Sequence, residues 1–250
     1  MENLSFAFPE KTEKEKIRIA KQFYKNLTDT FIEMIKLISI PYAAAAKRVD
    51  IDMTYLDTVV KNGKSVTILA GHQFNWEWAS FVIPPKLSCP FVGIYAPIAN
   101  ANINKLFYTI RTRSGNTFIS NKEFKFKIHE VFKKQYIIGL AADQNPSDPS
   151  RAYWLSFFGR TAPFLTGPGK SSIKENTTVV FGSFYKVKRG YYKVDIMPLE
   201  ENPSERTPEE ITIHYRNMLE QAVREDPPNY LWSHRRWRHQ WKEGYNEILD

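Results

Sequence analysis

One stretch decides the fold: SVTILA at residues 65–70, followed directly by GHQFNWEW at residues 71–78. A short, wholly apolar run that ends at a glycine is typical of a buried strand. Three further apolar runs lie at residues 90–95, 136–141 and 177–186, and helical patterns separate them at residues 101–114, 122–134 and 168–175. Buried strands that alternate with helices predict a largely parallel sheet with helices on both faces.

The N-terminal part predicts a long helix. Thr12 and Glu15 form a capping-box pattern, and apolar residues follow at helical spacing: Ile19, Phe23, Leu27, Phe31, Ile35 and Ile38. Such an amphipathic helix either packs on a sheet or lies on a membrane. Packing on the sheet is the commoner arrangement, so we expect it here.

The remaining segments complete a single α/β domain over residues 1–250. A shorter helix is expected near residues 53–61, and residues 190–196 look like a hairpin partner for the preceding strand, which makes the sheet mixed. Thr207, Pro208 and Glu210 begin a helix that extends to about Glu225. The predicted fold class is therefore a mixed, largely parallel central sheet flanked by helices.

Composition and charge limit the possible partners. The net charge of +8 favours an anionic partner, which could be nucleic acid, a phospholipid surface or an acidic carrier protein. The single cysteine, Cys89, excludes an internal disulfide framework and a multi-cysteine metal site. No apolar run approaches the roughly 18 residues of a membrane span, and the charged N-terminus does not resemble a signal peptide.

The stretch after the first central strand has the position of a site. Reactive groups in open α/β sheets gather beyond the carboxyl ends of strands, and His72 follows Ala70 there. Glu77 cannot share a helix face with His72, because five residues turn a helix by about 500°. If the helix begins near Asn75, however, Glu77 can reach back to the imidazole from its first turn. This pairing would make His72 a general base, although a buried structural histidine is the simpler alternative.

The motif His72-x-x-x-x-Glu77 resembles the H-x-x-x-x-D/E motif of the glycerolipid acyltransferase superfamily, in the form found in the lipid A biosynthesis (late) acyltransferases of Gram-negative bacteria. Further blocks of similarity run in order along the chain: residues 3–10, 104–115, Asp143-Gln144, 157–159 and 230–236. The resemblance covers essentially the whole sequence.

This resemblance implies transfer of a fatty acyl group from the thioester of acyl carrier protein, or of coenzyme A, to a hydroxyl of a lipid A precursor. His72 would be the general base and Glu77 would orient it, with no covalent intermediate, no cofactor and no metal. The expected location is the cytoplasmic face of the inner membrane. Residues 1–40 would follow a membrane anchor that this sequence lacks, and residues 226–250 form a basic, aromatic C-terminal segment.

Several further residues are candidates for substrate binding. Arg111 and Arg113 diverge by about 200° on a helix, so only one is expected to face the site, where it would bind a phosphate or an oxyanion. Asp143 and Gln144 follow a strand as His72 does, and Asp143 would bind a sugar hydroxyl or position a helix N-terminus. Gly167 precedes a helix start that could receive an anion, but a turn is the more ordinary role.

Aromatic and basic residues suggest contact with the membrane. Trp76 and Trp78 either line an acyl tunnel or belong to the core. There are two basic clusters. One lies in a helical stretch and contains Lys122, Lys125, Lys127, Lys133 and Lys134; the other lies near the C-terminus and contains Trp232, Arg235, Arg236, Trp237, Arg238 and Trp241. Both clusters suit contact with an anionic leaflet or a carrier protein, but the first could also be a solvated face and the second a packed C-terminal segment. Two alternatives remain open: an acyltransferase for an aminolipid or glycerolipid, and a basic nucleic-acid-binding protein.

Overall fold

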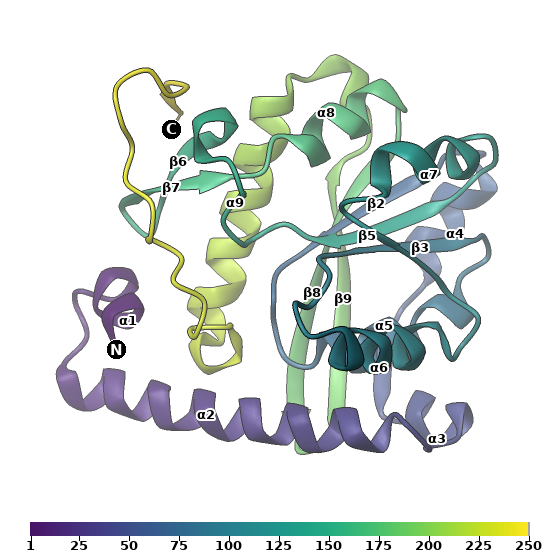
Figure 1. Ribbon diagram of the computed structural model, residues 1–250, viewed down its shortest axis with the longest axis horizontal. Helices are drawn as coiled ribbons and strands as arrows, with labels where there is room; N and C mark the ends of the chain where they lie inside the picture. The colour runs from purple at the N-terminus through teal and green to yellow at the C-terminus, as the bar shows by residue number, and fades with distance from the viewer. Residues whose placement is uncertain (250) are drawn as a thin grey trace.

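The central sheet has seven strands in the order β1-β9-β8-β2-β5-β3-β4 (Figure 1). The protein is described here by a computed structural model, which covers residues 1–249. In sheet order the strands are β1 (Val49–Ile51), β9 (Tyr191–Glu200), β8 (Thr178–Lys188), β2 (Val66–Ala70), β5 (Ile137–Ala141), β3 (Phe91–Tyr95) and β4 (Thr117–Ser120). All four strands expected from apolar runs are present, and the predicted fold class is confirmed.

The sheet is mixed because of one hairpin. β2 lies parallel to both β5 and β8, with Ala70 opposite Ala141 and Gly182. β8 and β9 are antiparallel, and β1 pairs with β9 in parallel. The carboxyl ends of β2, β5 and β8 therefore point to the same edge of the sheet, which is the edge where the sequence placed a site.

Helices cover both faces and this edge (Figure 1). They are α1 (Glu2–Ala7), α2 (Glu13–Lys36), α3 (Tyr42–Ala46), α4 (Thr54–Lys61), α5 (Trp76–Val82), α6 (Ala101–Thr112), α7 (Phe124–Phe132), α8 (Gly167–Lys174) and α9 (Pro208–Glu225). Thr12 and Thr207 each form the predicted capping box, with Glu15 and Glu210. These caps satisfy amides of the first turn and fix where the two longest helices begin.

A second, three-stranded sheet was not predicted. It contains β10 (Ile248–Leu249), β6 (Tyr153–Phe157) and β7 (Arg160–Phe164) in that order. The β6–β7 turn places Phe158 and Gly159 at φ values of 54° and 71°. These residues form the turn between the two strands, because two-residue hairpin turns favour positive φ and glycine supplies it at little cost.

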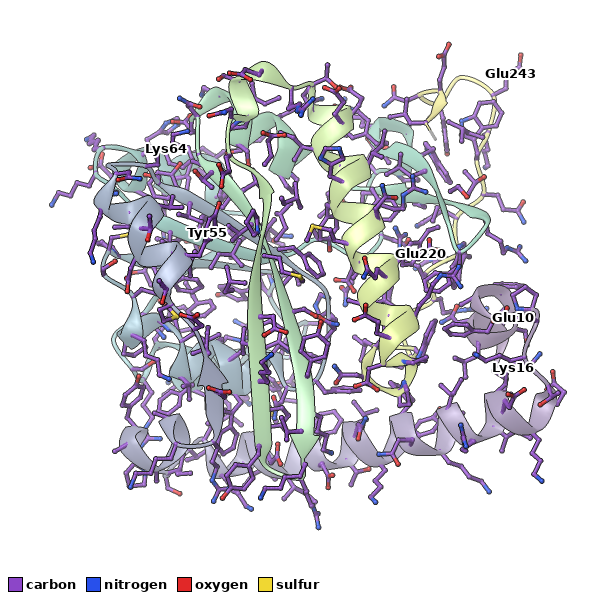
Figure 2. The ribbon with its side chains drawn as sticks, turned by 180° about the vertical axis from the view of Figure 1, so that it is seen from behind. Glu10, Lys16, Tyr55, Lys64, Glu220 and Glu243 are labelled. Atoms are coloured by element: carbon purple, nitrogen blue, oxygen red, sulfur yellow. The ribbon has the colours of Figure 1, made fainter. Side chains whose placement is uncertain are left out.

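The packing expected for α2 is confirmed only for its first half. Ile19 and Phe23 are buried in the main core, whereas Phe31 and Ile35 are 53% and 63% exposed. The second half buries polar residues instead, because it meets the basic tip of the β8–β9 hairpin, where Lys186 bonds to Asp29. Figure 2 shows α2 along one edge of the molecule, with many side chains projecting away from the body. Within residues 1–249, no helix has both the length and the apolarity to cross a bilayer.

Candidate active site

His72 lies in the loop between β2 and α5, where the backbone is held from several sides. The backbone N–H of Leu231 donates to the His72 carbonyl at 3.1 Å, so the C-terminal segment packs on this loop. A Cβ at Gly71 would lie 2.6 Å from Leu219 of α9. Glycine therefore permits the close approach of α9 to the loop that carries His72.

The hydrogen-bond partner of His72 is Asp143. Because β2 and β5 are neighbours with Ala70 opposite Ala141, the residues that follow these two strands meet at the sheet edge. His72 Nδ1 lies 2.6 Å from Asp143 Oδ1. The carboxylate is buried at 2% side-chain exposure, while the imidazole is 21% exposed. A carboxylate that accepts from Nδ1–H leaves the lone pair on Nε2 of the neutral ring, free for an incoming proton.

The expectation that Glu77 orients the imidazole directly is corrected by this geometry. Asn75 caps α5 as predicted, accepting from the Trp78 amide, and Glu77 lies buried in the first turn. Its carboxylate, however, accepts from Arg111, with Nε at 2.9 Å and a second bond from Nη2, and from Trp76 Nε1 at 3.1 Å. Glu77 thus fixes Arg111 and Trp76, and Asp143 fixes the tautomer of His72.

Electrostatics favour a basic imidazole. Burial disfavours the charged ring, but the Asp143 carboxylate outweighs burial and raises the pKa of His72 above its ordinary value of 6.5. Burial likewise disfavours ionised Asp143, yet the attraction of His72 and hydrogen bonds lower the pKa of that carboxyl. The pair is therefore stabilised as carboxylate and imidazolium, which is the state a general base reaches after it accepts a proton.

The site has aromatic walls. The ring of Trp76 lies edge-on to His72 with centroids 5.4 Å apart and stacks on Phe74. Arg111 lies over the rings of Tyr95 and Phe107, at 5.7 and 5.5 Å. Trp76 is half-buried beside the imidazole, and its role in lining an acyl tunnel stays a prediction. Trp78, in contrast, is fully buried and donates to the Ala45 carbonyl, which is a core role.

The other predicted binding residues have separate positions. Arg111 adjoins His72 closely enough to influence its charge, whereas Arg113 donates to the Leu37 carbonyl at the end of α2. This agrees with the expected divergence of the two arginines. Gln144 continues the loop after Asp143 and is half-buried. Gly167 begins α8 and is exposed. Of these four residues, Arg111 has the most direct connection to the His72–Asp143 pair.

The C-terminal segment contributes residues for which the sequence left two alternatives open, contact with a membrane and packing against the domain. Arg236 is 1% exposed, donates from Nη1 to Asn145 Oδ1 at 2.9 Å, and lies 4.3 Å from the Phe164 ring. His234 Nε2 accepts from the Asn145 amide, and burial together with Arg236 lowers the pKa of His234 to about 4. The segment is therefore part of the support behind Asp143.

For part of the C-terminal cluster, the structure shows the packed segment that the sequence allowed. Trp232 and Arg236 are buried, and Trp237 packs against the main core. Arg235, Arg238 and Trp241 remain exposed. The lysines of the α7 cluster are all exposed, as a docking surface requires.

We call His72, Glu77, Arg111 and Asp143 the His72 cluster. It combines an oriented, partly accessible base with a buried carboxylate and with a cation held by a second carboxylate. Such an arrangement can take a proton from a hydroxyl while a positive charge lies close to the developing negative charge.

Comparison with known proteins gives consistent matches. Residues 1–239 match the family described as bacterial lipid A biosynthesis acyltransferase. The chain is also similar to the lipid A biosynthesis lauroyltransferase of Escherichia coli (strain K12), with 22% identity over 238 residues. That alignment covers 94% of this chain and 77% of the lauroyltransferase. The family match includes the entire His72 cluster.

Proposed function

Because this chain belongs to the bacterial lipid A biosynthesis acyltransferase family, we propose that it acylates a hydroxyl of a lipid A precursor with His72 as the general base. The observation that supports this role is the 2.6 Å contact between Nδ1 and Asp143, which leaves Nε2 as the proton acceptor. Membership of this family makes the chain a transferase of lipid A biosynthesis. The identity of the acyl donor and the route of the proton are what we propose in addition.

The proposed reaction is direct. The acceptor hydroxyl oxygen attacks the thioester carbonyl carbon as its proton passes to His72 Nε2, and a tetrahedral oxyanion forms. The carbon–sulfur bond then breaks, the new ester is released, and the imidazolium returns its proton to the leaving thiolate. Asp143 stabilises the imidazolium during this interval. The raised pKa of His72 supports its ability to accept the proton.

In this proposal Glu77 positions Arg111, and Arg111 contacts the substrate. The carboxylate holds the guanidinium in a two-point contact, and Trp76 bonds to the same carboxylate. Arg111 is 14% exposed at its side chain, so it can still meet a substrate oxygen. We propose that it stabilises the oxyanion or binds a phosphate of the glycolipid. Gln144 and Gly167 remain predicted substrate contacts, whereas Arg113, which bonds to the end of α2, is the arginine that does not face the site.

Replacing Arg111 with lysine is expected to lower kcat/KM by about 10- to 100-fold, because lysine keeps the charge but loses the planar two-point contact with Glu77. Arg113→Lys is the matched control, since its contact to the Leu37 carbonyl needs one donor only. We expect that control to stay within about twofold of the parent. Steady-state kinetics on both variants measure the difference, and equal losses would contradict a specific role for Arg111.

The proposed donor is an acyl carrier protein. Its acidic surface would meet the exposed lysines of α7, and the acceptor would come from the cytoplasmic face of the inner membrane. The test is acyl transfer in detergent, with labelled acyl carrier protein and acyl coenzyme A offered against a lipid A precursor, an aminolipid and a glycerolipid. We expect labelled lipid A precursor with the carrier-protein donor and none with a His72 variant. Preferential labelling of the aminolipid or the glycerolipid would show that the lipid A precursor is not the acceptor. Hydrolysis of the thioester without any labelled lipid would contradict the proposal.

A further inference from the structure

The second half of α2 turns its polar side toward the protein. Its buried residues are Asn26, Asp29, Thr30 and Glu33. Asp29 forms ion pairs of 2.7 and 2.8 Å with Lys186 and Arg189 of the β8–β9 hairpin. Glu33 accepts from Asn75 Nδ2 at 3.1 Å, in the loop that leads from His72 to α5. The polar side of α2 therefore supports both the hairpin and the catalytic loop.

The opposite side of α2 is apolar and exposed. We call the following residues, with their exposed fractions, the α2 outer face: Ile17 (44%), Tyr24 (62%), Phe31 (53%), Ile32 (41%), Ile35 (63%) and Ile38 (48%), the last just beyond the helix. Their spacing of three, four and seven residues keeps them on one side of the helix. Large apolar side chains that are exposed together on one side of a helix often mark a surface that binds a partner or a membrane.

The charges around the α2 outer face are mainly positive, and its exposed acidic residues, Glu13 and Glu15, lie in the first turn of the helix. Between residues 17 and 36, all of which the structure describes, the exposed charged side chains are Arg18, Lys21, Lys25 and Lys36, while Asp29 and Glu33 are buried. The nearby hairpin adds an exposed Val187 and Lys188. Apolar side chains bordered by lysines and arginines are what an interfacial helix presents to anionic lipid.

We propose that the α2 outer face docks on an anionic phospholipid surface, with its apolar side chains in the acyl–headgroup boundary and its cations on lipid phosphates. This deepens the proposed function and rests on it for the link to the glycolipid. The inner side of the same helix holds the loop after His72. Docking would thus place the catalytic loop about 10 Å from the lipid surface, since that is the thickness of a helix with its side chains.

The test is sedimentation with vesicles of phosphatidylcholine, with and without about one-third phosphatidylglycerol, a share large enough for a negative surface potential. The full chain is expected to bind the anionic vesicles more tightly, and added salt should weaken that binding. The double variant F31E/I35E is expected to lose binding at least tenfold. Ile248→Glu is the matched control, because Ile248 is 46% exposed on β10, next to the C-terminus and away from α2 (Figure 1), and it should bind as the parent does.

Several outcomes would overturn the docking surface. They are equal binding by the double variant and the parent, no binding by a folded parent, or a change from dimer to monomer in the double variant, which would make the face a contact between copies. His72 variants separate this inference from the proposed function. If they bind vesicles but do not transfer acyl groups, both proposals hold; if the parent transfers acyl groups in detergent without binding vesicles, only the docking surface fails.

Discussion

His72→Asn is expected to lower kcat of acyl transfer by about 10³-fold or more, because it removes the proton acceptor from the site. Asparagine is the sharper variant, since its amide nitrogen lies where Nδ1 lies and can still donate to Asp143. His72→Ala should also abolish turnover. It leaves a carboxylate of 2% exposure without its partner, however, which costs about 3 kcal/mol of folding free energy or more.

Turnover is measured in detergent with saturating donor, and circular dichroism with a thermal melt confirms that each variant is folded. His129→Asn is the matched control, because His129 is exposed on α7 and should be silent. Near-parental turnover by a folded His72→Asn variant would remove His72 as the base.

The central strands and their largely parallel class were predictable because these strands are buried on both faces. All of Val66, Thr67, Ile68 and Leu69 are buried, so their sequence is apolar enough to stand out from the surrounding helices. The short edge strands β1 and β4 lack this signal, and in the hairpin β6–β7 Pro163 and Arg160 interrupt it. These strands depend on packing with distant segments, such as β10 against β6, which local patterns do not contain.

The candidate site was predictable in its position and not in its pairing. His72 and Asp143 each follow a buried strand, so both were expected at the same sheet edge. Their contact requires β2 and β5 to be neighbours in the sheet. The apolar pattern of a strand does not predict which other strand will lie beside it. Glu77 was favoured as the partner because it is close in sequence. Asn75 caps the helix as expected, but the Glu77 carboxylate pairs with Arg111 of α6, a contact between segments that are distant in sequence.

The behaviour of α2 shows the same limit. Its periodicity indicated an apolar stripe, but periodicity cannot say what covers that stripe. In the second half of the helix, the ion pairs of Asp29 with the β8–β9 hairpin determine which side faces inward. Because these ion pairs turn the polar side of α2 toward the protein, Phe31 faces solvent. The ion pairs join segments that are distant in sequence, so the local pattern of α2 could not predict them.

Asp143→Asn is expected to lower kcat by about 10²- to 10³-fold and to move the acidic limb of the pH–rate profile to lower pH. A base works only when unprotonated, so activity of the parent should fall as pH decreases through the raised pKa of His72. Without the Asp143 carboxylate, burial disfavours the charged imidazolium with little opposition and lowers the pKa of His72. The ring then stays neutral at lower pH, but it is a weaker base and its tautomer is no longer fixed.

The measurement is kcat/KM from about pH 5 to 9, a range that brackets the ordinary pKa of histidine, with Asp50→Asn as the matched control. Asp50 is exposed in β1, and its loss of charge should leave the profile in place. A shift of the acidic limb distinguishes electrostatic coupling from simple loss of stability, because partial unfolding lowers the amplitude of the profile without moving its midpoint. An unmoved limb, or one moved to higher pH, would show that Asp143 does not set the basicity of His72 and that the base assignment needs another partner.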